Sequence, residues 1–450
     1  IKPVVLWTDA LLYVLLATAV VTAFYVRGKP HLAEPFRRVG QSPAGVAALV
    51  VLSAYVALGF MDSLHFRAAL PPKPGLPRQY AVETLSLLDV ALAPLRAGGE
   101  KTYSAPLAWQ GLSKEAVEGP GGVEVRAYPR LAHGGAHLAD PPRQWAGDVA
   151  WRAGLGLLLG LAVWGGGAVL LAAWRGKGSL AARWRALWRG EARQAARVAL
   201  VTFGVLCVFA FPVAMLAAHY HVLGTDKVGQ DVLYIALKSV RTALVIGTLA
   251  TLIMLPFAVL LGIVAGYARG WVDDVVQYLY TTLNSIPGVL LIAAAVLMME
   301  VWMEGNPALF DTVAMRADAR LFFLCLILGV TNWTGLARLL RGEALKLGAM
   351  DYVEAARAFG VPGWRIVLRH LLPNVMHIVL ISVVMDFSGL VLAEAVLSYV
   401  GVGVDPTTFS FGNMINGARL EMAREPPVWW TLAAAFARSG EIGDCRRDGH

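Results

Sequence analysis

Long apolar runs alternate with short polar connections over most of the chain. About 20 consecutive apolar residues cross the hydrocarbon layer of a bilayer as a helix. Runs near that length predict membrane-spanning helices at 4–26, 44–60, 149–174, 197–218, 239–266, 276–302, 320–340 and 374–400. A further run at 427–437 is too short to span. The first run lacks a basic leader and a small-residue cleavage site, so it is interpreted as a retained helix.

The polar connections carry the charge that orients the chain. Basic residues gather at 27–38 and 175–197, and short basic loops stay on the cytoplasmic side of a membrane. Counting spans from these loops predicts that the N-terminus lies outside and that the polar segment 351–373 lies inside.

The stretch 61–146 is the long polar exception, and the same count places it on the outer side. It is large enough for a small domain. Residues 81–95 have a helical spacing of Leu and Val, and residues 123–129 alternate like a strand. We expect either a packing or docking module or, as the alternative, a solute-binding module.

Composition agrees with a polytopic membrane protein. Hydrophobic residues make up 57% of the chain and charged residues 16%, with a mean hydropathy of +0.59. A soluble protein of this length would need more charge on its surface. The net charge of +8 is concentrated beside apolar runs, which is typical of loops that face anionic lipid rather than of nucleic-acid binding. The three cysteines have no metal-ligand spacing, so no metal site is predicted.

A Gly-rich run at 154–171 precedes the sequence GKGS. It lacks the preceding strand and the spacing of a phosphate-binding loop, so Gly156 and Gly160 are predicted to be close-packing positions between helices. The sequence has no other nucleotide-binding motif, and any ATPase is therefore expected in a separate chain.

The polar segment 351–373 has the signals of a short capped helix. Asp351 is predicted as the N-cap, with Glu354 completing a capping box. Gly360 is predicted to take the left-handed conformation that ends the helix, and Pro362 prevents its continuation.

A second short helix is predicted at 363–371, after which Pro373 breaks or kinks the chain. Helices of two turns are unstable alone. The neighbouring spans or a partner must therefore hold the segment.

The order of residues in this segment resembles the cytoplasmic signature of permease subunits of bacterial ABC importers. The matching residues are Glu354, Ala355, Ala356, Gly360, Leu372 and Pro373. Further stretches are similar to the dipeptide, oligopeptide and nickel group of these permeases: LGTDKVGQDVL (223–233), AGYARGWVDD (265–274), SIPGVLL (285–291), DYVEAARAFG (351–360), RHLLPN (369–374), LSYVGVGV (397–404) and FGNMI (411–415). These matches stretch over the region from about residue 197 to 430, which is roughly half of the chain.

The resemblance implies an all-α bundle of the type I ABC importer permease kind in the bacterial inner membrane. Its expected partners are a second permease, two ATPase subunits that bind ATP and Mg, and an extracytoplasmic solute-binding protein. The short helix would couple the pore to the ATPase through Glu354, Ala355, Ala356, Arg357, Gly360 and Arg365. The carried solute would be a dipeptide, an oligopeptide or a nickel chelate.

Polar residues and a proline within the membrane runs are candidates for the translocation path, because ionisable and amide groups are costly in lipid. The candidates are Asn284, Pro287, Asn332 and Asp386. The alternative is that the polar groups bond to neighbouring helices and that the proline only kinks its helix.

The motif LGTD and the residues after it suggest a contact with the external binding protein. The candidates are Gly224, Thr225, Asp226 and Asp231, followed by a re-entrant or surface helix near 231–241. The alternative is a turn that only caps the following helix.

These expectations divide the chain into five parts. Residues 1–60 form a two-span hairpin, 61–146 the outer insert, 147–196 a third span with a basic linker, 197–437 the permease domain, and 438–450 an atypical tail. The three-span block before residue 197 is extra to the family pattern, and the tail suggests truncation or a frameshift.

Two other classes of protein would show different sequence features. An ion-driven secondary transporter would have duplicated halves with matching broken helices, and no such repeat is visible. A membrane enzyme would need a catalytic constellation, and the sequence offers none. A permease subunit without enzymatic activity is therefore predicted.

Overall fold

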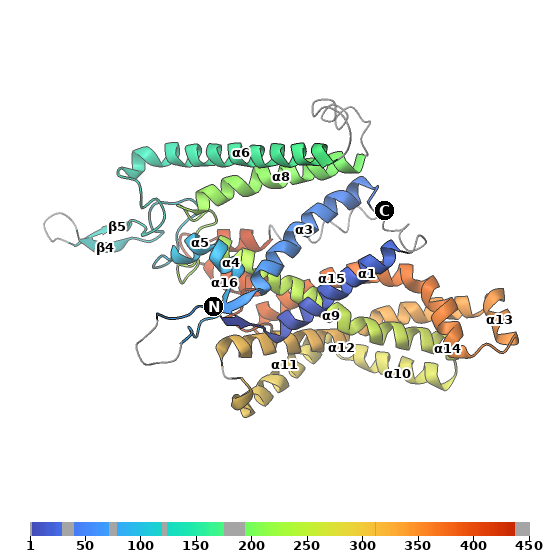
Figure 1. Ribbon diagram of the computed structural model, residues 1–450. Helices are drawn as coiled ribbons and strands as arrows, with labels where there is room; N and C mark the ends of the chain where they lie inside the picture. The colour runs from blue at the N-terminus through green and yellow to red at the C-terminus, as the bar shows by residue number, and fades with distance from the viewer. Residues whose placement is uncertain are drawn as a thin grey trace.

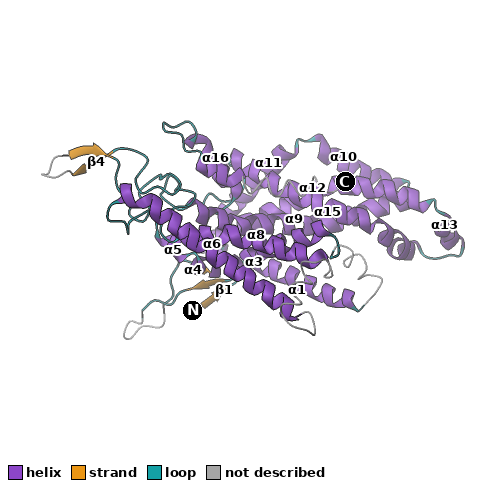
Figure 2. Cartoon of the chain, turned by 90° about the horizontal axis from the view of Figure 1, so that it is seen from above, coloured by secondary structure: helices purple, strands orange, loops and turns teal. Residues whose placement is uncertain are grey.

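The computed structural model describes residues 2–28, 40–71, 79–118, 124–174, 194–310 and 312–436. Its helices run along one long direction, with α13 (Asp351–Ala358) at one end and the hairpin of β4 (Glu115–Glu118) and β5 (Glu124–Ala127) at the other (Figure 1). Figure 2 shows the same two extremes from above. We name them the inner end and the outer end, after the predicted sidedness. The predicted helical membrane fold is confirmed.

Helices α9 (Val232–Ala268) and α12 (Val313–Gly348) lie side by side at the centre and both run from the outer to the inner end. Glycines allow their close approach. A Cβ on Gly266 would lie 2.5 Å from the carbonyl oxygen of Arg341, and a Cβ on Gly329 would lie 2.9 Å from that of Ala250. Small residues at such contacts are typical of packed membrane helices.

The other helices of the C-terminal half surround this pair. They are α10 (Trp271–Ser285), α11 (Gly288–Gly305), the 3₁₀ turn η1 (Pro307–Leu309), α14 (Gly363–Ile366), the π-helical turn η2 (Val367–Leu371), α15 (Leu372–Val400) and α16 (Phe411–Glu421). Helix α15 returns to the outer end against α9, and α16 packs on α15 there. Residues 430–436 are helical, whereas the atypical tail, 438–450, lies outside the described residues.

The predicted single span 276–302 is wrong, because two helices, α10 and α11, share this stretch. Ile286 has an extended backbone and Pro287 precedes the first residue of α11. A proline lacks the amide hydrogen that a continuous helix would need and drives the preceding residue out of helical conformation.

Helices α6 (Pro141–Trp174) and α8 (Gln194–Ala217) form an antiparallel pair beside the centre. A Cβ on Gly156 would lie 2.5 Å from Cα of Pro212, and a Cβ on Gly160 would lie 2.7 Å from the carbonyl oxygen of Cys207. The predicted close-packing role of these two glycines is confirmed.

The N-terminal helices pack on α8, α9 and α12 rather than only on each other. Helix α1 (Trp7–Arg27) contacts α12 and α9, and α3 (Pro43–Ser63) contacts α8 and α9. The two meet near their outer ends, where the rings of Tyr13 and Phe60 lie 6.2 Å apart. The predicted domain boundaries stay predictions.

The outer insert contains little regular structure. A three-stranded antiparallel sheet joins β1 (Lys2–Val4), β2 (His65–Arg67) and β3 (Leu85–Ser86), with Pro3 opposite Phe66 and Phe66 opposite Leu85. The helices α4 (Leu87–Ala91) and α5 (Ala93–Ala97) follow. The helix predicted at 81–95 is therefore confirmed only in its second half, and the strand predicted within 123–129 is confirmed as β5.

Within the described ranges, six helices are long and apolar enough to cross a membrane: Pro43–Ser63, Pro141–Leu170, Gln194–Ala217, Val232–Ala268, Gly288–Gly305 and Gly363–Val400. The predicted spans 4–26 and 320–340 lie in α1 and α12, which are not among the six. The apolar stretch of α1 is the shorter Trp7–Thr22.

The relative sidedness of the ends agrees with the charge pattern. The ends of α1, α3, α6 and α8 that border the predicted cytoplasmic loops all lie toward the inner end, the end of α13 (Figure 1). Most of both loops, 29–39 and 175–193, falls outside the described residues.

Candidate coupling segment and outer contacts

Helix α13 begins one residue earlier than the capping prediction requires. Met350 occupies the N-cap position with an extended backbone and no side-chain cap, and Asp351 is already helical. The backbone amide of Glu354 donates to the carbonyl of Met350 at 3.1 Å. The predicted capping box is therefore wrong. Asp351 and Glu354 still place negative charge in the first turn, where the helix dipole favours it.

The predicted end of the helix is confirmed. Gly360 has a φ of +76°, which is the left-handed region that glycine adopts without a steric penalty. Its amide donates to the carbonyl of Arg357 at 3.0 Å, and the amide of Val361 donates to that of Ala356 at 3.1 Å. These bonds close the last turn in the manner of a Schellman motif.

Three apolar side chains anchor the segment to its own chain. Val353, Ile366 and Leu371 are fully buried and belong to one core cluster with the inner halves of α9 and α12. A helix of two turns cannot stand alone, and this cluster supplies its support. The rest of α13 is free to face outward.

Five of the six predicted coupling residues are exposed: Glu354, Ala355, Arg357, Gly360 and Arg365. Ala356 is half-buried against the core cluster. The guanidinium of Arg357 lies 5.1 Å from the ring centre of Tyr267, and that of Arg365 lies 5.3 Å from the ring of its neighbour Trp364.

Large aromatic side chains lie among these polar groups. Phe359 is 87% exposed and Trp364 is 63% exposed. An exposed apolar surface rimmed by charge is typical of a protein contact. The role of the segment in coupling stays a prediction that this geometry supports.

The second helix predicted at 363–371 is present as α14 and η2, but Pro373 does not break the chain. It falls in the first turn of α15, where the missing amide hydrogen is not needed. The π-helical turn at Val367–Leu371 accommodates the join instead. The helical chain therefore runs from Gly363 to Val400.

The candidate path residues are not brought together by direct contacts. Asn284 accepts a hydrogen bond from Thr334 at 3.1 Å, which ties α10 to α12. Asn332 donates to the carbonyl of Leu328 on its own helix at 2.8 Å. Asp386 is half-buried and makes no hydrogen bond to a described residue, and Pro287 is exposed at the break between α10 and α11.

Three of the four predicted binding-protein contacts are buried in the single chain. Thr225 and Asp231 are 0% and 2% exposed, and the outer insert covers them. The Thr225 hydroxyl donates to the carbonyl of Thr102 at 2.9 Å, and it accepts from the amide of Ser104 at 2.6 Å. Gly224 is buried as well, with a φ of +71° that lets the carbonyl of Ser104 approach. Only Asp226 remains half-exposed.

The predicted surface helix near 231–241 is wrong, because these residues form the buried start of α9. Asp231 caps α9 directly, with its carboxylate accepting from the amides of Leu233 at 2.8 Å and Tyr234 at 3.2 Å. The residues after it are the first three turns of the central helix.

Comparison with known proteins identifies the second half of the chain. Residues 258–438 match the family described as binding-protein-dependent transport system inner membrane component. This part of the chain is similar to the members of that family. The resemblance to ABC importer permeases of the peptide group is thereby confirmed, and the chain is a multi-pass inner-membrane protein.

Curated relatives match the same half. The dipeptide transport system permease protein DppC of Lactococcus lactis subsp. cremoris is 31% identical over 44% of this chain and 52% of its own length. The oligopeptide permease OppC of Mycobacterium bovis is 30% identical over 43% and 62%. The glutathione permease GsiD of Pectobacterium atrosepticum is 30% identical over 46% and 63%. The chain thus spans between about half and two thirds of each relative.

A polar stripe at the start of α9 joins this helix to the N-terminal part of the chain. Asp231, Tyr234, Lys238 and Arg241 follow one another at spacings of three, four and three residues, which places them on one face of the helix. Each of the four bonds to a residue that precedes α9, as the three contacts below describe.

Arg241 forms the deepest of these contacts. Its guanidinium lies 2.6 Å from Asp9 and 3.9 Å from Asp318, and it donates to the hydroxyl of Thr8 at 3.1 Å. Thr8 in turn hydrogen-bonds Asp318. Asp9 is fully buried and also bonds His65 at 2.7 Å. A buried cation between two buried carboxylates holds α1 against α9 and α12.

Lys238 and Tyr234 hold the insert. Their side chains bond the same carboxylate oxygen of Asp89, each at 2.7 Å, and the ammonium of Lys238 lies 3.4 Å from Asp62. Burial alone would raise the pKa of Asp89, but the Lys238 charge and these hydrogen bonds lower it to about 2.

His221, in the loop before α9, completes the contact. Its Nδ1 lies 2.7 Å from Asp231, and its Nε2 lies 3.5 Å from Glu100 of the insert. Burial would lower the pKa of His221, but the hydrogen bond to Asp231 and the Glu100 carboxylate raise it to about 9. The histidine is therefore a cation at neutral pH.

Sequence reasoning missed this set of contacts. The available signal was the spacing of Tyr234, Lys238 and Arg241 at the start of an apolar run, which predicts one polar face on a membrane helix. Their partners could not be found this way, because Asp9 and Asp89 lie more than a hundred residues away.

Proposed function

We propose that the chain is the permease subunit of an ATP-binding-cassette importer of short peptides and that α13 couples it to a separate ATPase. The observation that carries this proposal is the exposed surface of α13 within the matched permease domain. The helix is anchored through Val353 and presents Glu354, Arg357 and Phe359 outward.

A rigid exposed helix suits the transmission of force. The closed C-terminal turn at Gly360 and the buried anchor at Ile366 fix α13 relative to the inner ends of α9 and α12. Movement of an ATPase that holds α13 would therefore move these two helices. In this proposal Arg357 and Arg365 pair with acidic groups of the ATPase, which also carries ATP and Mg.

The proposed solute is a peptide of a few residues. The relatives named above carry dipeptide, oligopeptide or glutathione transport in their names, which supports this class. A second permease and an extracytoplasmic binding protein complete the proposed assembly. The binding protein would contact the outer insert and Asp226 rather than the covered Thr225.

The proposed path runs along the broken helix pair α10 and α11 and the neighbouring faces of α12 and α15. Asn284, Pro287 and Asn332 are exposed in the single chain. Polar groups in a membrane segment need a polar neighbour or water, and a pore shared with the second permease would supply both.

The coupling proposal is tested on the assembled complex. The chain is reconstituted with a candidate ATPase, second permease and binding protein from the same organism, and ATP hydrolysis stimulated by dialanine is measured. Glu354→Ala and Arg357→Ala are expected to reduce the stimulated rate roughly tenfold, as lost charge-assisted hydrogen bonds would. Lys346→Ala serves as the control, since Lys346 is an exposed cation at the end of α12. Equal stimulation in all variants would disprove the coupling role.

Uptake into vesicles separates the proposal from an ion-driven transporter. Uptake of labelled dialanine should require ATP inside the vesicle and should persist when an ionophore collapses the ion gradients. Uptake that survives inactivation of the ATPase but stops with the ionophore would instead favour a secondary transporter.

A further inference from the structure

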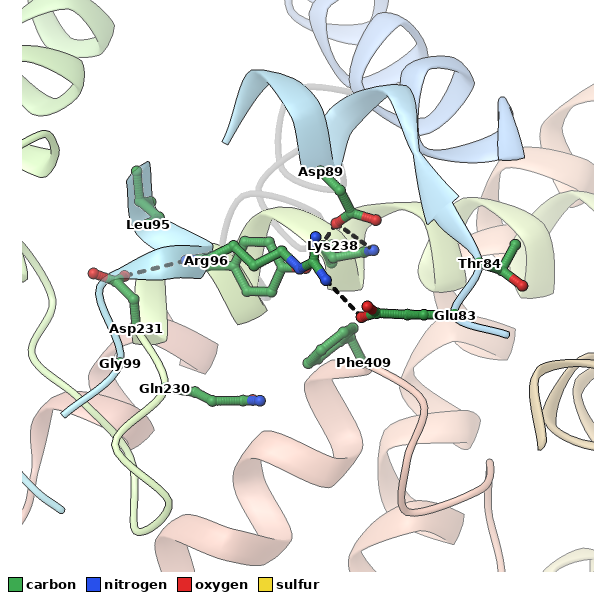
Figure 3. Close-up of a pocket in the computed structure, with 11 residues that line it drawn as sticks. Glu83, Thr84, Asp89, Leu95, Arg96, Gly99, Gln230, Asp231, Lys238 and Phe409 are labelled. Atoms are coloured by element: carbon green, nitrogen blue, oxygen red, sulfur yellow. Dashed lines mark hydrogen bonds and ion pairs between the residues drawn. The ribbon is translucent and has the colours of Figure 1, made fainter. Parts of the chain in front are cut away.

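A cavity of about 220 Å³ lies at the outer end, away from the candidate path (Figure 3). The insert, the start of α9 and the loop before α16 each contribute to its wall. The residues that define its chemistry are Glu83, Asp89, Arg96, Gln230, Lys238 and Phe409.

Two ion pairs in the wall differ in how firmly they are held. The Lys238 and Asp89 side chains are 13% and 4% exposed, whereas those of Arg96 and Glu83, 2.6 Å apart, are 36% and 67% exposed. An exposed pair adds little stability, so a ligand that carries both charges can replace it. The buried pair is tied to the fold and stays as part of the wall.

The cavity wall also contains an exposed amide and an aromatic ring. Gln230 is exposed, and its side chain makes no hydrogen bond to a described residue. It can both donate and accept, as a peptide group requires. Figure 3 shows Gln230 and the Phe409 ring below the Arg96 and Glu83 pair.

The volume limits the ligand. Pockets for drug-sized molecules measure about 300–1,000 Å³, so a cavity of about 220 Å³ suits an amino acid or a dipeptide. We propose that it binds a small zwitterion of this size, with the ligand carboxylate on Arg96, the ammonium on Glu83 and a carbonyl or amide on Gln230. The choice of a peptide as the ligand rests on the proposed function, whereas the charge requirement does not.

Binding is tested with the purified full-length chain alone, in detergent micelles, by isothermal titration calorimetry. Dialanine is expected to bind, and N-acetyl-dialanine amide, which has the same backbone without either charge, is expected not to. Arg96→Gln and Glu83→Gln should each weaken binding roughly tenfold or more, because each removes a charge-assisted hydrogen bond. Gln230→Ala should weaken it less.

The matched control is Arg143→Gln. Arg143 forms an exposed pair with Asp140 near the start of α6, outside the cavity, and its loss should leave the affinity unchanged. Equal affinity for the neutral compound, equal affinity in all variants, or absence of binding at millimolar dialanine would each overturn the inference. If the isolated chain does not bind dialanine but the assembled complex imports it, this site is overturned and the proposed function stands. If the isolated chain binds dialanine but the complex does not import it, the site stands and the proposed function is overturned.

Discussion

The outer and inner ends of the molecule differ in how far the charged groups named below are buried and paired. At the outer end, Asp9, Asp231 and Arg241 are buried and bonded to residues of the same chain. At the inner end, Glu354 and Arg357 are exposed beside a bare Phe359. Charge is costly to bury unless it is paired. The contacts of these three buried groups are therefore closed within this chain, and the inner surface is suited to a partner.

The same difference appears along helix α9, whose two ends are held by different kinds of contact. Helix α9 is fixed by charge at its first turns and packed by glycines at Gly262 and Gly266 near its last turns. Movement imposed at α13 would act on the inner end of α9, while the outer end of α9 is bonded to the N-terminal part of the chain. The contacts of Asp9 and Asp89 with α9 hold the outer end of this helix against the N-terminal part of the chain.

The largest expected effect is at Arg241. Arg241→Ala leaves Asp9 and Asp318 facing each other without their shared cation, and breaking a buried pair in this way costs about 3–5 kcal/mol. A large fall in the thermal unfolding midpoint of the full chain in detergent is expected. Arg357→Ala at the inner end should change stability by no more than about 0.5 kcal/mol. A similar fall in the unfolding midpoint of both variants would contradict the difference between the two ends.

A smaller effect is expected from pH at His221. Its pKa of about 9 in the folded chain lies above the ordinary value of 6.5, so its contribution to stability is complete below pH 6.5 and is lost as the pH rises through 9. The contribution of Glu100 to stability depends on pH in the opposite direction. Burial would raise the pKa of Glu100, but the His221 contact and three backbone amides lower it to about 2. The contribution of Glu100 is therefore complete above about pH 4.5 and is lost on acidification toward pH 2.

The amides of residues 132–134 report on this contact, because they donate to Glu100. At pH 6 they should exchange hydrogen faster in His221→Gln than in the unchanged chain, and at pH 10 the two should exchange alike. His370→Gln, in the inner segment, is the control and should not alter them. An equal difference at both pH values would show that His221 does not hold the insert as a cation.

How far the sequence predicts the molecule depends on the range of the interaction. Gly360 and the strand near Val125 follow from local rules about backbone conformation, and both are confirmed. The capping box failed because Val353 is drawn into the core and the helix starts one residue earlier than its polar residues suggest. Pro373 does not break the helical chain as predicted, because a π-helical turn lies just before it.

The outer contacts could not be predicted for a different reason. Thr225 and Asp231 look like surface turn residues, and only the fold shows that residues 102–104 cover Thr225. The pairing of Arg241 with Asp9 depends on how two helices pack, which a single sequence does not encode in a readable pattern. Charged residues in an apolar helix predict that partners exist, but not which ones.

A further contrast concerns two glycines near the inner end. Gly360→Ala should cost about 1 kcal/mol, because alanine is strained at a φ of +76°. Gly342→Ala should be neutral or stabilising by up to about 1 kcal/mol, since Gly342 is inside α12. An added Cβ meets nothing within 4 Å at either position. Thermal unfolding of both variants measures the difference, and equal shifts would contradict the left-handed conformation of Gly360.

The smallest expected effect on the isolated chain is at Phe359, and it tests the inner end most directly. Its ring is 87% exposed, so Phe359→Ala should leave the free energy of unfolding within about 0.5 kcal/mol of the original. If α13 docks on an ATPase, the same change should weaken that complex by roughly tenfold or more, as aromatic residues at interface centres do. Leu420→Ala is the matched control, because Leu420 is 71% exposed on α16 at the outer end. Surface plasmon resonance with the purified ATPase compares them. Equal weakening in both variants would mean that the ATPase does not distinguish the two ends, and a large loss of stability in Phe359→Ala would mean that the inner surface is not open in the isolated chain.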